Sequence, residues 1–213
     1  MLFNQLLKEN FDLNKTQLKK FEKYYFFLNE YNKKINLTSL ISEKDVYLKH
    51  FYDSLSISKI VDFQKINILC DLGTGAGFPG VPLKILYPNL RVVLIESSSK
   101  KATFLKLLIE HLDLNNIFVV KDKIENHSQK YNFVIVRALG KLELILKLAS
   151  LVTTNKGQFI AMKGPNYEEE LKNVKETHQF QLKDKFFLLL PEEAGKRVNL
   201  LFQKNNKKNK NFL

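Results

Sequence analysis

The chain has 213 residues, of which 45% are hydrophobic and 26% charged, and this balance is typical of a folded globular protein and excludes wholesale disorder. One cysteine and four scattered histidines argue against an internal disulfide or a metal site, and no apolar run approaches the roughly 18 residues of a membrane helix, so we predict a cytoplasmic protein that is neither membrane-bound nor metal-binding. The net charge of +12, half of it carried by residues 196–213, favours an anionic partner such as nucleic acid.

The first part of the chain has helical periodicity. Apolar residues between Lys15 and Lys34 recur at helical spacing, and Asn14 is placed to cap that helix. Further helices are predicted at about 42–51 and 54–62, after a turn at the NLTSL sequence. We therefore expect a helical N-terminal cap over residues 1–64, in which the apolar stripe of residues 18–31 packs against the sheet.

Strands and helices alternate after Lys65. Short apolar strands are predicted at residues 67–72, 91–96, 116–120, 133–138 and 157–164. Helices follow them, the first beginning near Pro79 or Pro82 and the others at residues 99–113, 141–152 and 167–175. Such alternation indicates a parallel sheet with helices on both faces.

Two last strands, at about 180–189 and 197–203, have no helix between them and should pair antiparallel. The predicted fold class is α/β, with a Rossmann-like sheet over residues 65–204 that ends in a closing antiparallel hairpin. Residues 205–213 are rich in lysine and asparagine and are predicted to form a disordered basic tail.

A glycine-rich loop, DLGTGAGFPG at residues 71–80, follows the first predicted strand. Open parallel sheets bind ligands at the carboxyl ends of their strands, and glycines let the backbone approach a ligand closely. Glu96 ends the second strand, where a carboxylate can accept hydrogen bonds from both hydroxyls of a ribose. The loop and this acid together predict a site for a cofactor that contains a nucleoside.

Two classes of cofactor compete for this loop. Residues 75–80 spell the GxGxxG fingerprint of dinucleotide-binding proteins, but the fingerprint begins two residues late, and Asp71 would oppose a pyrophosphate. The closing hairpin is also foreign to most dinucleotide folds. S-adenosylmethionine has no phosphate, and its amino group and sulfonium favour a nearby carboxylate. We therefore predict an S-adenosylmethionine-dependent methyltransferase, with a nicotinamide or flavin enzyme and a non-catalytic relic as alternatives.

Several motifs in combination resemble one family. HxxDS at residues 50–54 follows NLTSL, and DLGTGAGFPGVPL, ESSSKKATFL, VRA and MKG come after it in that order. With these motifs the chain resembles, over residues 10–204, the glucose-inhibited division protein B family, whose members methylate N7 of one guanine in 16S ribosomal RNA. The resemblance implies a class I methyltransferase fold, S-adenosylmethionine as cofactor, and 16S rRNA or the small ribosomal subunit as partner. We expect a monomer.

The predicted cofactor site combines the glycine loop with the ends of the next strands. From the loop itself we assign Asp71, Gly75 and Gly77. The resemblance adds Gly73 and Phe78 in the loop, Glu96, Ser97 and Ser98 at the ribose, Ile124 and Glu125 beside the adenine, and Arg137 at the face between cofactor and substrate. Asp122 could share adenine recognition with Glu125, and the choice between these two acids is left open.

Four residues are candidates for positioning the substrate rather than for covalent chemistry: His50, Asp53, Arg137 and Lys163. Each has a structural alternative. His50 could hold the cap to the sheet, Asp53 could be an N-cap, and Arg137 could form a structural ion pair. Lys163 could contact RNA phosphate or could simply be solvated.

The target atom is inferred from residue types that the chain lacks. Carbon-5 methylation of cytosine needs a cysteine nucleophile, whereas Cys70 lies inside the first predicted strand. Methylation of an exocyclic amine often uses an Asn/Asp-Pro-Pro-aromatic loop, and residues 137–140 read RALG instead. Guanine N7 carries a lone pair and no proton, so it requires alignment but no base. A small-molecule or protein methyltransferase and a non-catalytic RNA-binding assembly factor remain as alternatives.

Overall fold

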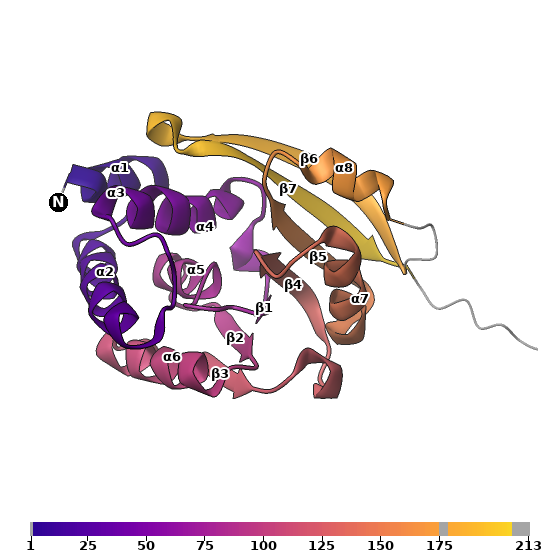
Figure 1. Cartoon of the computed structure of the whole chain (residues 1–213), viewed down its shortest axis with the longest axis horizontal. Coiled ribbons are helices and arrows are strands. Elements are labelled where there is room, and N and C mark those ends of the chain that lie inside the picture. Colours follow the sequence, from indigo (N-terminus) through magenta and orange to yellow (C-terminus); the bar gives the residue numbers. More distant parts are fainter. Residues whose placement is uncertain (1, 175–178, 206–213) are drawn as a thin grey trace, which may run out of the picture.

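A seven-stranded sheet forms the centre of the protein in the computed structural model, which describes residues 2–174 and 179–205. The strands are β1 (Ile68–Leu72), β2 (Arg91–Glu96), β3 (Ile117–Lys121), β4 (Tyr131–Arg137), β5 (Thr153–Lys163), β6 (Phe180–Leu190) and β7 (Gly195–Lys204). Their order is β3-β2-β1-β4-β5-β7-β6; β1 to β5 are parallel, and β7 runs antiparallel to β5 and β6 (Figure 1). The predicted parallel sheet and its closing hairpin are confirmed.

Helices cover both faces of this sheet. On one face lie α5 (Gly80–Leu86) and α6 (Ser99–His111), and on the other α7 (Leu142–Val152) and α8 (Tyr167–Lys172). Successive side chains of a strand point to opposite faces, so Leu69 packs with α5 and α6 while its neighbour Cys70 packs with α7. Cys70 is therefore a buried core residue, as predicted. The predicted end of α8 at residue 175 lies outside the described residues.

The cap consists of α1 (Leu2–Phe11), α2 (Lys15–Ile35) and one uninterrupted helical run. That run comprises α3 (Glu43–Asp45), the π-helix η1 (Val46–Tyr52), α4 (Asp53–Ser56) and the 3-10 turn η2 (Ile57–Lys59), and a further 3-10 turn η3 (Phe63–Lys65) precedes β1. The predicted break between residues 51 and 54 is therefore wrong, because Asp53 has helical dihedral angles (φ −54°, ψ −47°). Asp53 is consequently not an N-cap.

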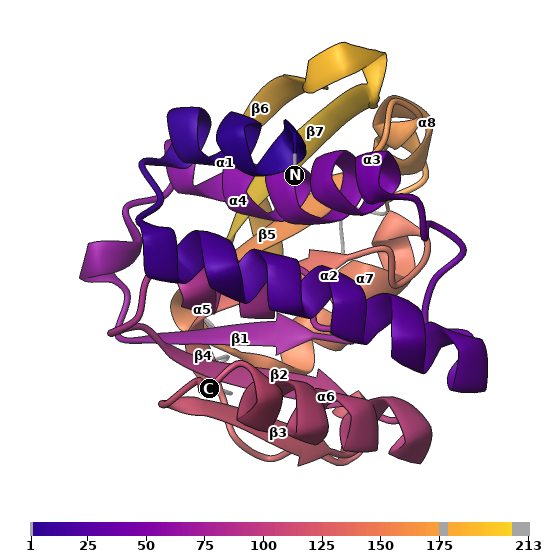
Figure 2. The same cartoon turned by 90° about the vertical axis from the view of Figure 1, so that its left-hand side faces the viewer.

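Helix α2 connects the cap to the rest of the fold. Asn14 caps it as predicted, since its side chain accepts the N–H of Gln17 and the Gln17 side chain accepts that of Asn14. The apolar stripe packs on α5 and α6, which lie between α2 and the sheet (Figures 1 and 2), so the prediction that it packs against the sheet itself is wrong. Because cap and sheet share one apolar core, the division at residues 64 and 65 stays a prediction.

The remaining sequence predictions concern the C-terminal tail, membrane-spanning helices and metal binding. The expected disordered tail lies outside the described residues, apart from Asn205. In the ranges 2–174 and 179–205, no helix is both long and apolar enough to cross a membrane. The same ranges contain no group of three or more His, Cys, Asp or Glu side chains that could hold a metal ion.

Tyr24 of α2 makes the most direct contact between the cap and the glycine loop. Its buried hydroxyl donates a hydrogen bond of 2.5 Å to the Ala76 carbonyl, and its ring stacks on Phe78. Tyr24→Phe would leave a buried carbonyl without its partner, so we expect the free energy of unfolding in urea to fall by about 1–3 kcal/mol. Tyr25→Phe, at a half-buried position, should change it by less than about 0.5 kcal/mol. Equal values for the two variants would contradict this role.

Candidate functional site

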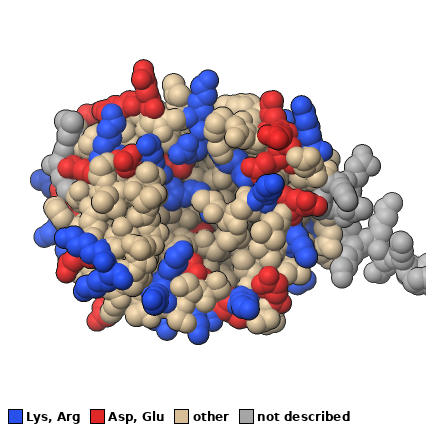
Figure 3. Space-filling model, in the orientation of Figure 1, with Lys and Arg blue, Asp and Glu red and all other residues tan. Residues whose placement is uncertain are grey.

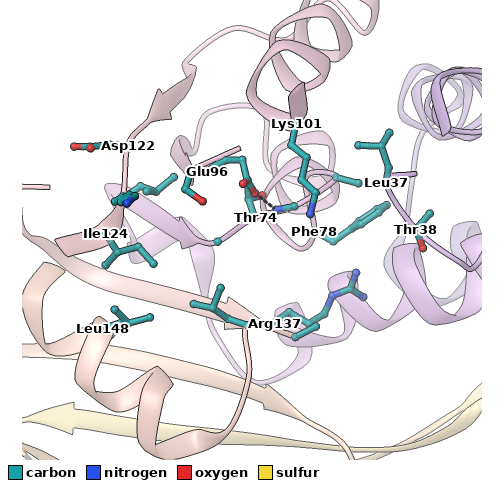
Figure 4. A pocket seen from close by; sticks show the side chains of 18 of the residues that line it. Leu37, Thr38, Thr74, Phe78, Glu96, Lys101, Asp122, Ile124, Arg137 and Leu148 are labelled. Atoms are coloured by element: carbon teal, nitrogen blue, oxygen red, sulfur yellow. Dashed lines mark hydrogen bonds between the residues drawn. The ribbon is translucent and has the colours of Figure 1, made fainter. Parts of the chain in front are cut away.

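The carboxyl ends of the parallel strands border a cavity of about 670 Å³, which we call the cofactor cavity (Figure 4). Its volume is within the range of small-molecule sites. It is lined by Leu37, Thr38, His50, Gly73, Thr74, Gly75, Ala76, Phe78, Ile95, Glu96, Ser97, Lys101, Asp122, Lys123, Ile124, Glu125, Arg137, Ala138, Leu139 and Leu148. Figure 3 shows a hollow in this face of the molecule, with Lys and Arg side chains within it and around its rim.

Asp71 lies beneath the glycine loop and does not line the cavity, contrary to prediction. Its Oδ2 accepts hydrogen bonds from the Thr74 hydroxyl (2.6 Å) and the Gly80 N–H (2.8 Å), so one carboxylate ties the beginning of the loop to the start of α5. Burial, partly offset by these hydrogen bonds, raises the pKa of Asp71 to about 6. Asp71 therefore shapes the loop from below and is not at the cavity surface.

Two glycines of the loop have different surroundings: Gly75 borders the cavity and Gly77 packs against the cap. At Gly75 (φ +61°) no atom lies within 4 Å of the position that a Cβ would take, so the bare backbone borders open space in the cavity. At Gly77 (φ +99°) a Cβ would lie 2.7 Å from the Tyr24 hydroxyl oxygen. Gly77 thus permits close packing of the cap and does not line the cavity, although the sequence placed it there.

Glu96 lies at the end of β2 and is only 7% exposed. Its Oε1 accepts the N–H of Ser98 (2.8 Å) and its Oε2 accepts the N–H of Gly75 (3.1 Å). A carboxylate offers about four acceptor positions, so both oxygens can still accept a hydrogen bond from a ligand. The Ser98 side chain instead caps α6 and is not at the cavity surface, whereas Ser97 is.

One end of the cofactor cavity combines apolar side chains with carboxylates. Ile124 and Leu148 face each other there (Figure 4), and Asp122 and Glu125 also line the cavity. Ile124 and Glu125 begin a short 3-10 turn, η4 (Ile124–Asn126), whose first N–H groups have no acceptor within the turn. Both acids line the cavity, so the choice between them stays open.

The opposite end is built around Arg137, which β4 brings against the cap. Its Nη1 donates to Asp53 Oδ2 (3.2 Å) and to the Lys49 carbonyl (2.9 Å), and its Nη2 lies 3.0 Å from His50 Nδ1. The guanidinium also lies over the Phe78 ring, on which the His50 ring stacks. Arg137 is therefore both paired structurally and exposed to the cavity.

His50 is held as a neutral imidazole by its partners. Because a guanidinium has no acceptor, Nδ1 must accept from Arg137, which leaves the proton on Nε2. Nε2 then donates to Thr38 Oγ1 at 3.0 Å. Burial, together with the charge of Arg137, lowers the pKa of His50 to about 3. Neither nitrogen is left to act as a base, and the residue joins the cap to β4 as its structural alternative suggested.

A second cavity of about 420 Å³, here called the acceptor cavity, adjoins the first. His50, Arg137 and Ala138 line both cavities, and Asp53 and Lys163 line the second. The four predicted positioning residues thus come together. Lys163 pairs with Glu170 (2.7 Å) and donates to the Gly140 carbonyl, and its side chain is only 10% exposed. Of its two alternatives, simple solvation is therefore wrong, and contact with RNA phosphate stays a prediction.

Comparison with known proteins decides the family. A family model described as GidB, rRNA small subunit methyltransferase G, matches residues 17–201. The chain belongs to this family. Proteins named ribosomal RNA small subunit methyltransferase G are similar to it: that of Aster yellows witches'-broom phytoplasma is 49% identical, covering 95% of this chain and 99% of that one, and that of Staphylococcus epidermidis is 39% identical, covering 99% and 92%. The resemblance seen in the sequence is confirmed.

Solved structures at lower identity show the fold alone. A predicted O-methyltransferase from Agrobacterium tumefaciens aligns with a TM-score of 0.58 and 20% identity over 73% of this chain and 81% of its own. M. jannaschii TYW2 in complex with AdoMet aligns with a TM-score of 0.53 and 20% identity over 71% and 75%. The chain is thus an rRNA small subunit methyltransferase G family member with a methyltransferase fold, and the nicotinamide or flavin alternative is wrong.

Several residues of this family member's cofactor cavity have no role predicted from the sequence. Thr38 lies in the NLTSL motif and Lys101 in the ESSSKKATFL motif, and both motifs carried the resemblance. Lys101 extends from α6 toward Phe78 and Arg137, and Leu37 lies next to Thr38 at the same end (Figure 4). The motifs therefore marked the segments that contain these residues, but the positions of residues within a motif do not show which side chains face the cavity.

Asp53 should stabilise this family member more than any surface ion pair. Its side chain is 3% exposed, and its Oδ2 accepts from both Arg137 and Arg197 at 3.2 Å. Removing one partner of a buried ion pair costs about 3–5 kcal/mol, and we expect Asp53→Ala to fall near the lower end because both guanidiniums reach solvent. Lys65→Ala, which breaks an exposed pair with Asp62, should cost less than about 1 kcal/mol. Denaturant unfolding measures both values, and a loss below 1 kcal/mol for Asp53→Ala would refute the ranking.

Proposed function

We propose that the protein transfers the methyl group of S-adenosylmethionine to N7 of a guanine in 16S rRNA, in the cytoplasm. The observation that carries this proposal is the junction of the two cavities at Arg137, where His50 is locked in its neutral form with both nitrogens engaged. A junction of this kind supplies alignment and charge but no base. It suits an acceptor atom that already has a free lone pair.

The residues of the cofactor cavity fit S-adenosylmethionine. The open backbone at Gly75 leaves room for a nucleoside, and the free acceptor positions of Glu96 suit two ribose hydroxyls. Ile124 and Leu148 offer apolar surface for an adenine, with Asp122 and Glu125 beside it. When bound, S-adenosylmethionine supplies a methyl group on positively charged sulfur, which an unprotonated nitrogen can attack.

The chain's own residues contribute position and electrostatics. Asp53, Lys49 and His50 take three of the five N–H hydrogens of Arg137, so the guanidinium is fixed while two donors remain for a ligand. Phe78 forms a wall between the loop and the cap, against which His50 and Arg137 lie. Holding two reactants in the productive geometry can account for several kcal/mol of a reaction barrier.

Incubation with labelled S-adenosylmethionine tests the acceptor class. We expect label in 16S rRNA from cells that lack the protein, and chain scission at one guanine after borohydride and aniline treatment. Label in the protein or small-molecule fraction alone would support the other methyltransferase classes. Cofactor binding without any transfer would support a non-catalytic assembly factor.

Glu96→Ala should weaken the binding of S-adenosylmethionine. A hydrogen bond to a charged group contributes about 1.5–3 kcal/mol, so the dissociation constant should rise roughly 10- to 150-fold. Titration calorimetry measures the change, and a thermal melt verifies that the variant remains folded. Glu110→Ala, an exposed acid on α6, is the matched control and should bind as the unaltered protein does. An unchanged affinity for Glu96→Ala would rule out the ribose assignment.

Methyl transfer should depend little on pH between about 6.5 and 9, because no general base loses a proton there. The pKa of His50 is lowered to about 3 and that of Asp71 is raised to about 6, so both groups lie below this window. His50→Asn should reduce the single-turnover rate by less than the ~10²–10⁴-fold of a lost general base. A tenfold rise per pH unit that His50→Asn abolishes would instead indicate a protonated acceptor.

A further inference from the structure

We propose that the acceptor cavity binds the guanine base itself and that Glu170 recognises its Watson–Crick edge. This inference rests on the proposed function, which supplies the guanine, and adds the residue that selects it. Glu170 lies in α8, and nothing in the sequence singles it out. It lines the acceptor cavity and not the cofactor cavity.

The acceptor cavity has the composition that a flat, polar-edged base needs. Leu40, Met162 and Pro165 offer apolar surface for the faces of a ring. Two of its polar residues, Arg137 and His50, also line the cofactor cavity and so mark the junction. The others line this cavity only: Lys49, Asp53, Lys163, Asn166, Glu170 and Arg197. The two faces of a base can therefore pack against apolar side chains, while its edges meet both hydrogen-bond donors and hydrogen-bond acceptors.

The junction determines how a guanine must be oriented. Its N7 has to face the cofactor cavity, and O6 is the neighbouring acceptor on the same edge. Arg137 lines both cavities and keeps two N–H hydrogens beyond those taken by Asp53, Lys49 and His50, so it can donate to O6. N1–H and the 2-amino group then face away from the junction, into the acceptor cavity.

Glu170 offers a carboxylate acceptor for those donors. Its Oε2 accepts the N–H of Leu142 (2.6 Å) and pairs with Lys163 Nζ (2.7 Å), which fixes the orientation of the carboxylate. Its Oε1 has no hydrogen-bond partner among the described residues. The two acceptor positions of Oε1 can therefore take N1–H and the 2-amino group of guanine. Adenine has an acceptor at N1 and no 2-amino group, and inosine lacks the 2-amino group alone, so both should bind more weakly.

A purely structural Glu170, which only ties α7 to Lys163, would also lower activity when altered, so the test must measure base selectivity. The protein is saturated with S-adenosylhomocysteine to fill the cofactor cavity, then titrated with guanosine, inosine and adenosine 5′-monophosphates. The chain has two methionines, and Met162 lines the acceptor cavity. Methyl-labelled methionine therefore gives one internal NMR signal inside the proposed site.

We expect the guanosine nucleotide to shift the Met162 signal and to bind about tenfold or more tightly than the other two, as a hydrogen bond to a charged group implies. Glu170→Gln keeps an acceptor for Leu142 but replaces one oxygen with a donor, so the preference for guanosine over inosine should fall below about twofold. Glu169→Gln, at the exposed neighbouring position, should leave the preference unchanged.

Three results would overturn the inference. They are an unshifted Met162 signal with every nucleotide, equal affinities of the unaltered protein for the three nucleotides, or a guanosine preference that survives in folded Glu170→Gln. The first two need no variant, so a misfolded Glu170→Gln would not leave the question open. If S-adenosylhomocysteine binds and RNA is methylated while any of these is found, only this inference fails. Failure of cofactor binding or of RNA methylation would refute the proposed function instead.

Discussion

The carboxylate of Asp53 is the point on which the site depends. One oxygen, Oδ2, accepts from Arg137 at the end of β4 and from Arg197 in β7, while Asp53 itself belongs to the helical run of the cap. Three segments far apart in the chain are thereby held together by a single buried charge. Burying a carboxylate is costly unless it is paired, so the helix, the strand and the hairpin stabilise the structure only in combination. The position of Arg137, and through it the protonation of His50, follows from this arrangement.

The two cavities are organised by side chains of opposite charge. The cofactor cavity is organised by acids that act through the backbone: Asp71 shapes the glycine loop from below, and Glu96 accepts the N–H of Gly75 from the side. The acceptor cavity is organised by cations and their partners, Arg137 with Asp53 and Lys163 with Glu170. Phe78 lines the cofactor cavity, and His50, which stacks on it, lines both cavities. The chemistry proposed for the junction needs this contrast, because a cationic donor orients the acceptor without competing for the methyl group.

Hydrophobic periodicity and sequence motifs predicted most of the secondary-structure elements of this protein, and the predictions that failed did so for physical reasons. The parallel strands, their order of appearance and the closing hairpin follow from alternating apolar segments and were found as expected. Helix α1 was missed although Phe3, Leu7 and Phe11 recur every four residues, because a short helix at a chain end has few residues to show a period. The helix break predicted between residues 51 and 54 is absent. It was predicted because a polar residue inside a helix resembles an N-cap when its tertiary partners are not known. Those partners, Arg137 and Arg197, lie 84 and 144 residues away.

The sequence by itself determined the fold class, the family and the elements that bear the site, because these depend on local periodicity and on motifs of adjacent residues. It could not determine which way a side chain of such a motif points. Asp71 faces the interior, Gly77 packs on the N-terminal cap and Ser98 caps α6, whereas Thr38, Lys101 and Leu139 line the cofactor cavity. Only the tertiary structure decided that Arg137 leaves His50 no free nitrogen, that Lys163 is buried against Glu170, and that a second cavity adjoins the first. Each of these features depends on contacts between distant segments, which form when the cap and the hairpin pack around β4. The residues next to each position in the chain do not reveal such contacts.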